Sequence, residues 1–238
     1  MKVEIWSDVM CPFCYIGKHH FEQALEKLPF KNEIEIDWKS YQLNPEYHNT
    51  SNEKIYDYLS RSKGVSVEHA KQMTQQVADM ATSAGLTINF DKNIPANTFN
   101  AHRLIHLAAK HNLQNTAEEK LFEAHFVQGK NIGEDAVLLE VAKEIGLDAT
   151  EAAVMLNSDQ YAEAVRYDIY ESQNLGIRGV PYFVMDRKYG VSGAQPVQAF
   201  TEALTQSFQE WKASQPKTTI TSLNKNDDAI CDEHGCEI

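Results

Sequence analysis

Two cysteines near the start of the chain have the spacing of a redox dithiol. Pro12 and Phe13 separate Cys11 from Cys14, and a predicted helix begins at this segment. The N-terminus of a helix offers unpaired N–H groups and a positive dipole end, which lower the pKa of a thiol and favour the nucleophilic thiolate. Proline suits this first turn because its missing N–H costs little there. We predict that Cys11 attacks and that Cys14, one turn further, resolves the mixed disulfide.

Half of a zinc site has the same spacing, so the surrounding elements must decide between metal and redox chemistry. Residues 3–6 form a predicted strand, and residues 34–38 alternate between apolar and polar side chains as a second strand does. Between them, residues 15–28 place apolar side chains at helical spacing. This order predicts a βαβ unit with the cysteines at its strand-to-helix turn, which favours redox chemistry.

The pattern changes to helical periods from about residue 46 to about residue 156. Strand signals return at residues 179–185 and 189–193, which predict a β-hairpin, and an amphipathic helix follows them. Because strands both precede and follow the helical segment, it is an insertion. The expected fold class is α/β with a large all-helical insertion. Its parts are an α/β domain (residues 1–45 and 157–212), a helical insertion (residues 46–156) and a flexible C-terminal tail (residues 213–238).

Composition excludes several classes of protein. The chain has 238 residues, of which 42% are hydrophobic, and a formal net charge of −12. Nucleic-acid binding is not expected, because phosphate backbones are bound by clustered Lys and Arg. No run of about 18 apolar residues is present, so we expect no membrane span. The first residues lack the pattern of a secretory signal, which predicts a cytoplasmic protein.

Four segments resemble the DsbA family of thiol-disulfide oxidoreductases, in particular its FrnE-like branch. These segments are residues 3–14, 97–103, 176–181 and 191–195. The resemblance implies a thioredoxin fold interrupted by helices, with the active site in the groove between the two parts. The pattern is shared by 2-hydroxychromene-2-carboxylate isomerases and kappa-class glutathione transferases, which typically have Ser where this chain has Cys11. That difference favours disulfide exchange.

Pro181 stands immediately before the predicted strand that follows the insertion. In thioredoxin-like folds a cis proline at this place faces the dithiol, and the backbone before it pairs with the substrate chain. The resemblance therefore adds Pro181 to the catalytic centre and assigns Pro12, Phe13, Val180 and His102 to the substrate groove. The competing interpretation is that Pro181 only opens an edge strand.

Phe13 also bears on the redox potential. Oxidants of the DsbA type have a histidine at this position, and its imidazole helps to stabilise the thiolate. Phenylalanine offers neither charge nor a hydrogen-bond donor. We therefore expect a potential less oxidising than the roughly −120 mV of DsbA.

Three other polar residues are candidates for a role near the dithiol. Asp8 is either a proton acceptor for the dithiol or a cap at the end of the strand, and we favour the cap. Glu4 is a candidate for a buried carboxylate beneath the dithiol. His102 either lines the groove or lies on a helix surface.

Cys231 and Cys236 form a second pair in the tail. We favour an auxiliary redox pair that exchanges electrons with Cys11 and Cys14, and FrnE-like proteins can carry such a pair. About 20 residues of flexible chain span roughly 25 Å on average, so reach does not oppose this. Zinc binding by the cysteines, with His234, and an inert pair are the alternatives.

The sequence therefore predicts a cytoplasmic oxidoreductase that acts on protein or small-molecule thiols and disulfides, with glutathione among the candidate partners. We expect no cofactor and no metal. A glutathione-dependent isomerase or transferase is the rival enzyme class. A redox- or metal-sensing binding module, with the tail as its switch, is the non-enzymatic alternative.

Overall fold

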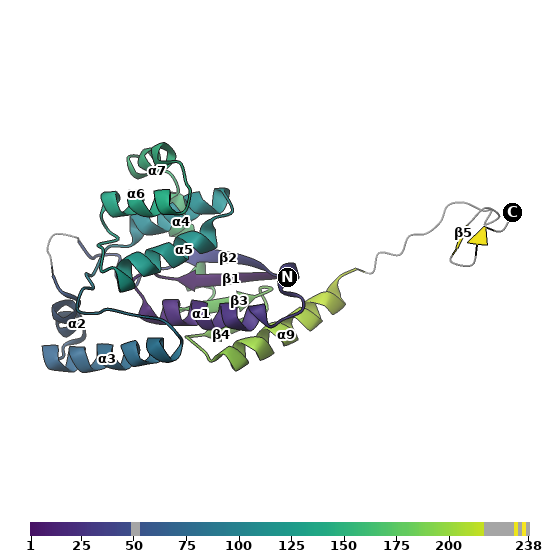
Figure 1. Cartoon of the computed structure of the whole chain (residues 1–238), viewed down its shortest axis with the longest axis horizontal. Helices are drawn as coiled ribbons and strands as arrows, with labels where there is room; N and C mark the ends of the chain where they lie inside the picture. The colour runs from purple at the N-terminus through teal and green to yellow at the C-terminus, as the bar shows by residue number, and fades with distance from the viewer. Residues whose placement is uncertain (49–52, 217–230, 233–234, 237–238) are drawn as a thin grey trace.

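A four-stranded mixed sheet lies at the centre of the protein (Figure 1). The structure, a computed structural model, describes residues 1–48 and 53–216 and the backbone of residues 231–232 and 235–236. The strands, in the order in which they lie side by side, are β2 (Glu35–Ser40), β1 (Lys2–Ser7), β3 (Tyr182–Met185) and β4 (Tyr189–Ser192). β1 is parallel to β2 and antiparallel to β3, which is antiparallel to β4.

The central strand β1 is buried on both faces, because alternate side chains enter two separate apolar clusters. Ile5 points to the larger cluster, beneath α1 (Pro12–Glu26) and α9 (Val197–Ser214). There Phe183 of β3 stacks on Phe21 of α1, with ring centroids 5.3 Å apart. On the opposite face, the indole of Trp6 donates to the carbonyl of Asp168 in α8 (Ala162–Asn174), at 2.9 Å.

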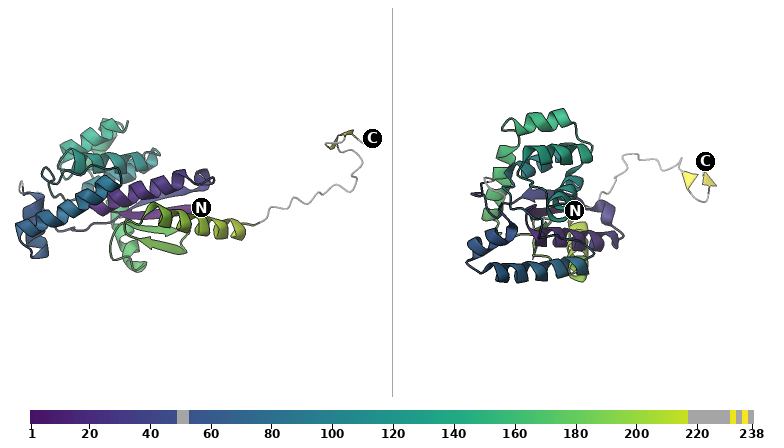
Figure 2. Two further views of the ribbon diagram at one scale, coloured as in Figure 1. Left: turned by 60° about the horizontal axis from the view of Figure 1, so that its bottom comes forward. Right: turned by 60° about the vertical axis from the view of Figure 1, so that its left-hand side comes forward.

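The segment between β2 and β3 is mostly helical. The short η1 (Lys31–Glu33) precedes β2. The elements after β2 are α2 (Ile55–Lys63), α3 (Val67–Ser83), α4 (Phe99–Lys110), α5 (Gln114–Phe122), the π-helical turn η2 (Glu123–Val127), α6 (Asp135–Glu144), α7 (Ala149–Leu156) and α8. Figures 1 and 2 show α4–α7 on one side of the sheet and α2 and α3 on the other, next to α1. The expected fold class is confirmed: an α/β sheet interrupted by a large helical segment. The predicted domain boundaries at residues 45 and 156 stay predictions.

Beyond α9, the described backbone contains two short strands, β5 (Cys231–Asp232) and β6 (Gly235–Cys236). They pair antiparallel, with Cys231 opposite Cys236. Residues 217–230, 233–234 and 237–238 lie outside the described residues, and so does most of the predicted tail, including His234. Within the described part of the chain, no helix has the length and apolar character that a membrane span requires.

Candidate active site

The dithiol lies where β1 turns into α1. Cys11 is the N-cap residue of α1, with an extended backbone, and no side chain caps this helix end. Its N–H donates to the carbonyl of Asp8 at 2.9 Å, and its carbonyl accepts from the N–H of Cys14 at 3.0 Å. Pro12 fills the first helical position. The helix therefore presents its N-terminal end, with unpaired N–H groups and positive dipole, at the sulfur of Cys11.

The two thiols are in different environments. Both are free and buried, with Cys11 4% and Cys14 1% exposed. The Cys14 thiol has a pKa well above its ordinary value, first because it is buried, and then because of the hydrogen bond to Cys11 and the negative charge that Cys11 can hold. The N–H of Asp8 and the hydroxyl of Ser7 act in the opposite direction. Cys14 is therefore held as a thiol, which suits a group that reacts second.

The loop before β3 lies against Cys11. The sulfur of Cys11 is 3.7 Å from the carbonyl oxygen of Val180, and the peptide bond between Val180 and Pro181 is cis. The carbonyl of Pro181 accepts from the N–H of Gly193 at 2.8 Å, at the end of β4. The structure thus brings together Cys11, Cys14 and Pro181, which were assigned to the catalytic centre, and Val180, which was assigned to the substrate groove.

Gly17 makes this closeness possible, and sequence reasoning missed it. A β-carbon at Gly17 would lie 2.9 Å from Cγ of Pro181 and 3.4 Å from Cα of Ala194. Glycine in a helix interior costs about 1 kcal/mol relative to alanine. A glycine one turn after a reactive cysteine was therefore a signal of close packing.

Several residues near the dithiol turn have exposed or partly exposed apolar side chains. Phe13 is 40% exposed, and Pro12 and Val180 are partly exposed. Leu43, in the loop after β2, is 48% exposed, and its N–H donates to Asp8 at 2.7 Å. Sequence reasoning did not single out Leu43, because only the folded chain brings that loop to the turn after β1.

His102 does not line the groove, so this prediction is wrong. The side chain is 1% exposed, and its Nε2 lies 3.5 Å from Oδ1 of Asp8. The first residues of α4 turn inward because its apolar face packs on α5, α6 and α7. Asp8 is itself fully buried and accepts from the N–H groups of Met10 and Leu43, which agrees with its predicted role at the end of the strand. Glu4 lies away from the dithiol, where it pairs with Arg187.

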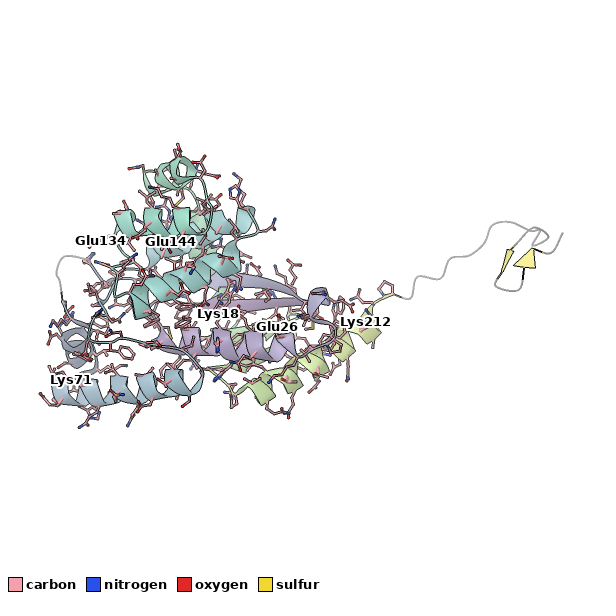
Figure 3. All side chains as sticks on the ribbon, viewed as in Figure 1. Lys18, Glu26, Lys71, Glu134, Glu144 and Lys212 are labelled. Atoms are coloured by element: carbon pink, nitrogen blue, oxygen red, sulfur yellow. The ribbon has the colours of Figure 1, made fainter. Side chains whose placement is uncertain are left out.

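An ion pair with a buried lysine joins α1 to α5. Lys18, labelled in Figure 3, is 2% exposed. Its ammonium contacts Glu119 at 2.6 Å and Glu22 at 2.8 Å. The hydroxyl of Tyr15 donates to the same Glu119 at 3.2 Å. Burial lowers the pKa of Lys18, but the attraction of the Glu22 and Glu119 carboxylates outweighs this effect. The pKa of Lys18 is therefore raised above its ordinary value. The helix that carries the dithiol is therefore fixed to the helical segment by polar contacts.

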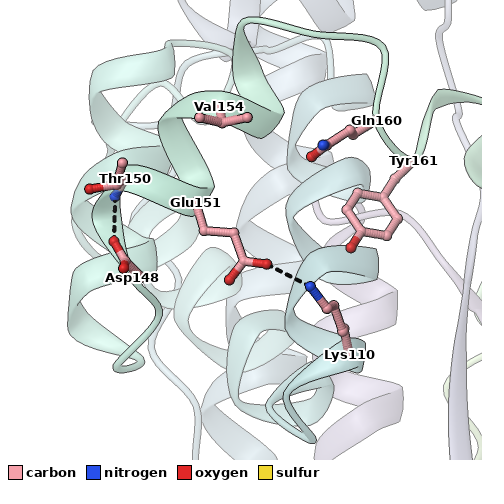
Figure 4. A pocket seen from close by; sticks show the side chains of 7 residues that line it. All are labelled: Lys110, Asp148, Thr150, Glu151, Val154, Gln160 and Tyr161. Carbon is pink, nitrogen blue, oxygen red and sulfur yellow. Dashed lines mark hydrogen bonds and ion pairs between the residues drawn. The ribbon is translucent and has the colours of Figure 1, made fainter.

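Two cavities lie near α4. One, of about 530 Å³, lies between α4 and α7, where Lys110 pairs with Glu151 at 2.9 Å and Asp148 accepts from the N–H of Thr150 (Figure 4). It contains no residue of the dithiol centre. The other, of about 360 Å³, is lined by Gln42, Pro45, Asn97, Phe99, Asn100 and Gly133, and so adjoins the loop of Leu43. Among the described residues, no group of His, Cys, Asp or Glu side chains is arranged to hold a metal ion.

The auxiliary pair is described only by its backbone. Cys231 and Cys236 are opposite each other in the β5–β6 pairing, and their side chains lie outside the described part. The role of this pair therefore stays a prediction.

Comparison with known proteins agrees with this geometry. The model of the DSBA-like thioredoxin domain matches residues 2–205. A probable DsbA oxidoreductase from Streptomyces coelicolor is 35% identical, with a TM-score of 0.84, and the match covers 100% of this chain and 99% of that one. The uncharacterized protein YwbO of Bacillus subtilis (strain 168) is 26% identical over 207 residues, which are 86% of this chain and 96% of YwbO.

A more distant structure shares the fold alone. The cytosolic disulfide reductase DsbM from Pseudomonas aeruginosa is 15% identical, with a TM-score of 0.62, and the match covers 88% of this chain and 100% of that one. With a dithiol at the start of α1 and a family match over most of its length, this chain belongs to the DSBA-like thioredoxin domain family.

Proposed function

We propose that this member of the DsbA-like thiol oxidoreductases exchanges disulfides through Cys11 and Cys14, as the FrnE-like branch does. The observation that carries the proposal is the asymmetry of the two thiols. Cys11 occupies the N-terminal end of α1 next to the carbonyl of Val180, whereas the more deeply buried Cys14 has a raised pKa. Cys11 is therefore placed to attack first, and Cys14 retains its proton until the resolving step.

The reaction consists of two exchanges. The thiolate of Cys11 attacks a substrate disulfide, forms a mixed disulfide and expels one substrate thiolate. Cys14 then loses its proton and attacks the sulfur of Cys11, which releases the second substrate thiolate. The protein ends as the Cys11–Cys14 disulfide and the substrate gains two electrons; in the opposite direction the protein oxidises its substrate.

Insulin-disulfide reduction and oxidative refolding of a reduced protein test both directions. We expect wild type to be active in at least one assay and Cys11→Ser to be inactive in both. Cys14→Ser should accumulate mixed disulfides, because its first step is intact and its second is blocked. Inactive wild type in both assays would contradict the proposal.

Protein disulfides are the proposed principal substrates, because the apolar side chain of Phe13 is exposed between the two cysteines and Leu43 is exposed on a loop bonded to Asp8. Glutathione is a second candidate partner, since a structure of DsbM with GSH shares this fold. The rival enzyme class, a glutathione-dependent isomerase or transferase, has a structural counterpart in 2-hydroxychromene-2-carboxylate isomerase, which is 11% identical and shows the fold alone. Glutathione binding with turnover that survives Cys14→Ser would favour that rival.

We place the activity in the cytoplasm. The location stated for DsbM supports this, and so does the mild potential expected from Phe13. Cell fractionation tests the location, and recovery of the protein outside the cytoplasm would contradict it.

The tail pair is proposed as an electron-exchange partner of the dithiol. Residues opposite each other in an antiparallel pair have Cα atoms about 4.5–5.5 Å apart, which is within the range of disulfides. The backbone pairing of Cys231 with Cys236 therefore supports a disulfide between them. Mass mapping of trapped disulfides in Cys14→Ser tests the exchange, and failure to find a bridge from Cys11 to either tail cysteine would oppose it. Stoichiometric zinc in the reduced protein would favour the metal alternative.

A further inference from the structure

The loop that faces the dithiol carries an arginine without a partner. Arg178 is exposed and stands two residues before Val180, whose carbonyl oxygen is 3.7 Å from the sulfur of Cys11. The side chain of Arg178 forms no hydrogen bond or ion pair with any residue that the structure describes. The other arginines of the chain all have such contacts: Arg61 with Glu53, Arg103 with backbone carbonyls, Arg166 with Glu163 and Arg187 with Glu4. The loop therefore presents a free positive charge close to the reactive sulfur.

The backbone of this loop is fixed on both sides of Arg178. Ile177 is 4% exposed, belongs to the apolar cluster around Trp6, and donates its N–H to the carbonyl of Ser172 in α8 at 2.9 Å. Val180 packs against the same cluster. Arg178 is thus held between two anchored residues, and only its long side chain extends into solvent.

A substrate at the dithiol comes within reach of this side chain. Consecutive Cα atoms are about 3.8 Å apart, so the Cα of Arg178 lies within about 7.6 Å of the Cα of Val180. Between them, a β-carbon on Gly179 would meet no atom within 4 Å, so the space over the loop is open. Charges interact over about 8 Å at physiological ionic strength. The guanidinium can therefore act on a charged group that lies next to the sulfur bound at Cys11.

The charge of the whole protein makes this local cation important. The chain has 34 Asp and Glu residues against 22 Lys and Arg residues, a formal net charge of −12. Such a surface repels an approaching carboxylate. A guanidinium binds carboxylates well, because its N–H groups match their two oxygens and it keeps its charge at all working pH values. Arg178 therefore opposes the general repulsion where the thiol reacts.

We propose that Arg178 selects disulfides that carry a carboxylate beside the reactive sulfur. This inference rests on the proposed function and names a substrate class for it. Arg178 attracts the carboxylate to the loop and so holds the disulfide at Cys11; it supplies neither a proton nor electrons to the exchange. Two sources share this chemistry: glutathione disulfide, and peptide disulfides with an acidic residue next to the cysteine.

Oxidation of the reduced protein by two aromatic disulfides separates recognition from reactivity. Dithiobis(nitrobenzoate) has a carboxylate on each ring, whereas dithiodipyridine is uncharged, and both release a thiol that is followed by its absorbance. Full-length protein with Cys231→Ser and Cys236→Ser is the background, so that only the dithiol reacts. The ratio of the two rates is measured for this background and for Arg178→Gln and Arg178→Lys in it. A change in the nucleophilicity of the thiol affects both rates and cancels in the ratio.

Lys27→Gln is the matched control, because it removes the same charge from the other end of the same helix. Lys27 is the exposed C-cap residue of α1, and its side chain has no partner among the described residues, whereas Cys11 is the N-cap residue. At about 1.5 Å per residue of helix, the two lie roughly 24 Å apart. This distance exceeds the Debye length of about 10 Å at about 0.1 M salt.

We expect Arg178→Gln to lower the rate ratio, carboxylate disulfide over neutral disulfide, by about three- to fivefold at about 0.1 M salt, the effect of an exposed ion pair. Arg178→Lys should keep most of the preference because it keeps the charge, and Lys27→Gln should match the background. At about 1 M salt, where the Debye length is about 3 Å, the difference should disappear. An unchanged ratio in Arg178→Gln, or an equal fall in Lys27→Gln, would overturn the inference.

Natural disulfides identify the source of the carboxylate. Loss of protein thiols is measured with glutathione disulfide and with two disulfide-linked peptides that differ only in Glu or Gln after the cysteine. Dependence on Arg178 for glutathione disulfide, or for the Glu peptide over the Gln peptide, supports the inference and names the source; dependence for neither would overturn it. The failure of the proposed function looks different, since Cys11→Ser would then react with dithiodipyridine as fast as the background protein.

Discussion

A β-carbon on Gly17 would lie 2.9 Å from Cγ of Pro181, so the helix that carries the dithiol and the loop opposite it are in direct contact. Gly17 is one turn beyond Cys14, on the side of α1 that faces the end of β4. The distance between Cys11 and Val180 depends on this contact, because both segments would have to separate to admit a larger residue.

Gly17→Ala should therefore destabilise the protein and slow its chemistry. Overpacking costs about 1–3 kcal/mol of folding stability. The higher helix propensity of alanine offsets roughly 1 kcal/mol of this loss. Urea unfolding measures the stability, and release of a coloured thiol from an aromatic disulfide measures the reactivity of Cys11. Gly179→Ala is the control for stability, because a β-carbon there would meet no atom within 4 Å. Equal stability of the two variants would contradict the close contact.

The residue between the cysteines should set the redox potential. Phe13 is 40% exposed beside Cys11 and supplies no charge, so wild type should be less oxidising than roughly −120 mV. Phe13→His should shift the potential towards oxidising values by about 30 mV or more, because an imidazolium stabilises the thiolate of the reduced form. Equilibration with glutathione measures both values. Phe13→Gln, polar but uncharged, should change the potential less; a wild-type value near that of DsbA would refute the prediction.

Arg103 should be a structural anchor. Its guanidinium is buried and donates to the carbonyls of Met155, Ser158 and Gln160, which fixes the connection between α7 and α8. Arg103→Lys removes the planar fork and leaves carbonyls unpaired, so we expect a loss of about 2–3 kcal/mol in the free energy of unfolding.

Urea unfolding checks this loss, with Arg166→Lys as the matched control. Arg166 is 59% exposed and pairs with Glu163, so its replacement should cost about 0–1 kcal/mol. Both variants should retain the wild-type rate of thiol release, because neither arginine contacts the dithiol. A similar effect of the two substitutions on stability would argue against the anchor.

Glu118 should make stability depend on pH above about 4.5. Its pKa in the folded protein, about 8, exceeds its ordinary value of 4.5, so the folded state binds more protons than the unfolded state between these values. The stability contributed by this group therefore falls as pH rises through that interval. Glu118→Gln, which cannot ionise, should become more stable relative to wild type from pH 5 to pH 9.

Unfolding free energies in urea at both pH values give the comparison. The control is Glu68→Gln, because Glu68 is exposed in the first turn of α3. This variant should show the same pH dependence as wild type. A constant difference between Glu118→Gln and wild type across the interval would mean that Glu118 ionises as an ordinary carboxylate.

Local patterns were sufficient for much of the fold. The strands at residues 2–7 and 182–185 and the helix after Cys11 agree with the apolar periods of the sequence. These elements could be predicted because a strand or helix shows its buried face within a few residues of chain. The actual ends differ by one to three residues, and α9 continues to Ser214, because hydrogen bonding and tertiary packing determine where an element stops.

Burial of polar residues could not be predicted in the same way. The sequence placed His102 in the groove, whereas the fold buries it against Asp8, 94 positions earlier in the chain. Glu118 and His125 lie on helices whose local pattern does not distinguish a charged surface position from a position beneath another layer. Such a residue becomes buried only when a distant segment covers it.

By itself, the sequence determined where the candidate centre lies in the chain: two cysteines at the start of a helix, within a βαβ unit, and a proline before a later strand. These are features of spacing, and spacing along the chain is preserved in the fold. Only the tertiary structure decided that Gly17 touches Pro181, that the N–H of Leu43 bonds the carboxylate of Asp8, and that His102 is buried against Asp8. These relationships depend on desolvation and on contacts between distant segments, and both arise only when the layers of the protein close over one another.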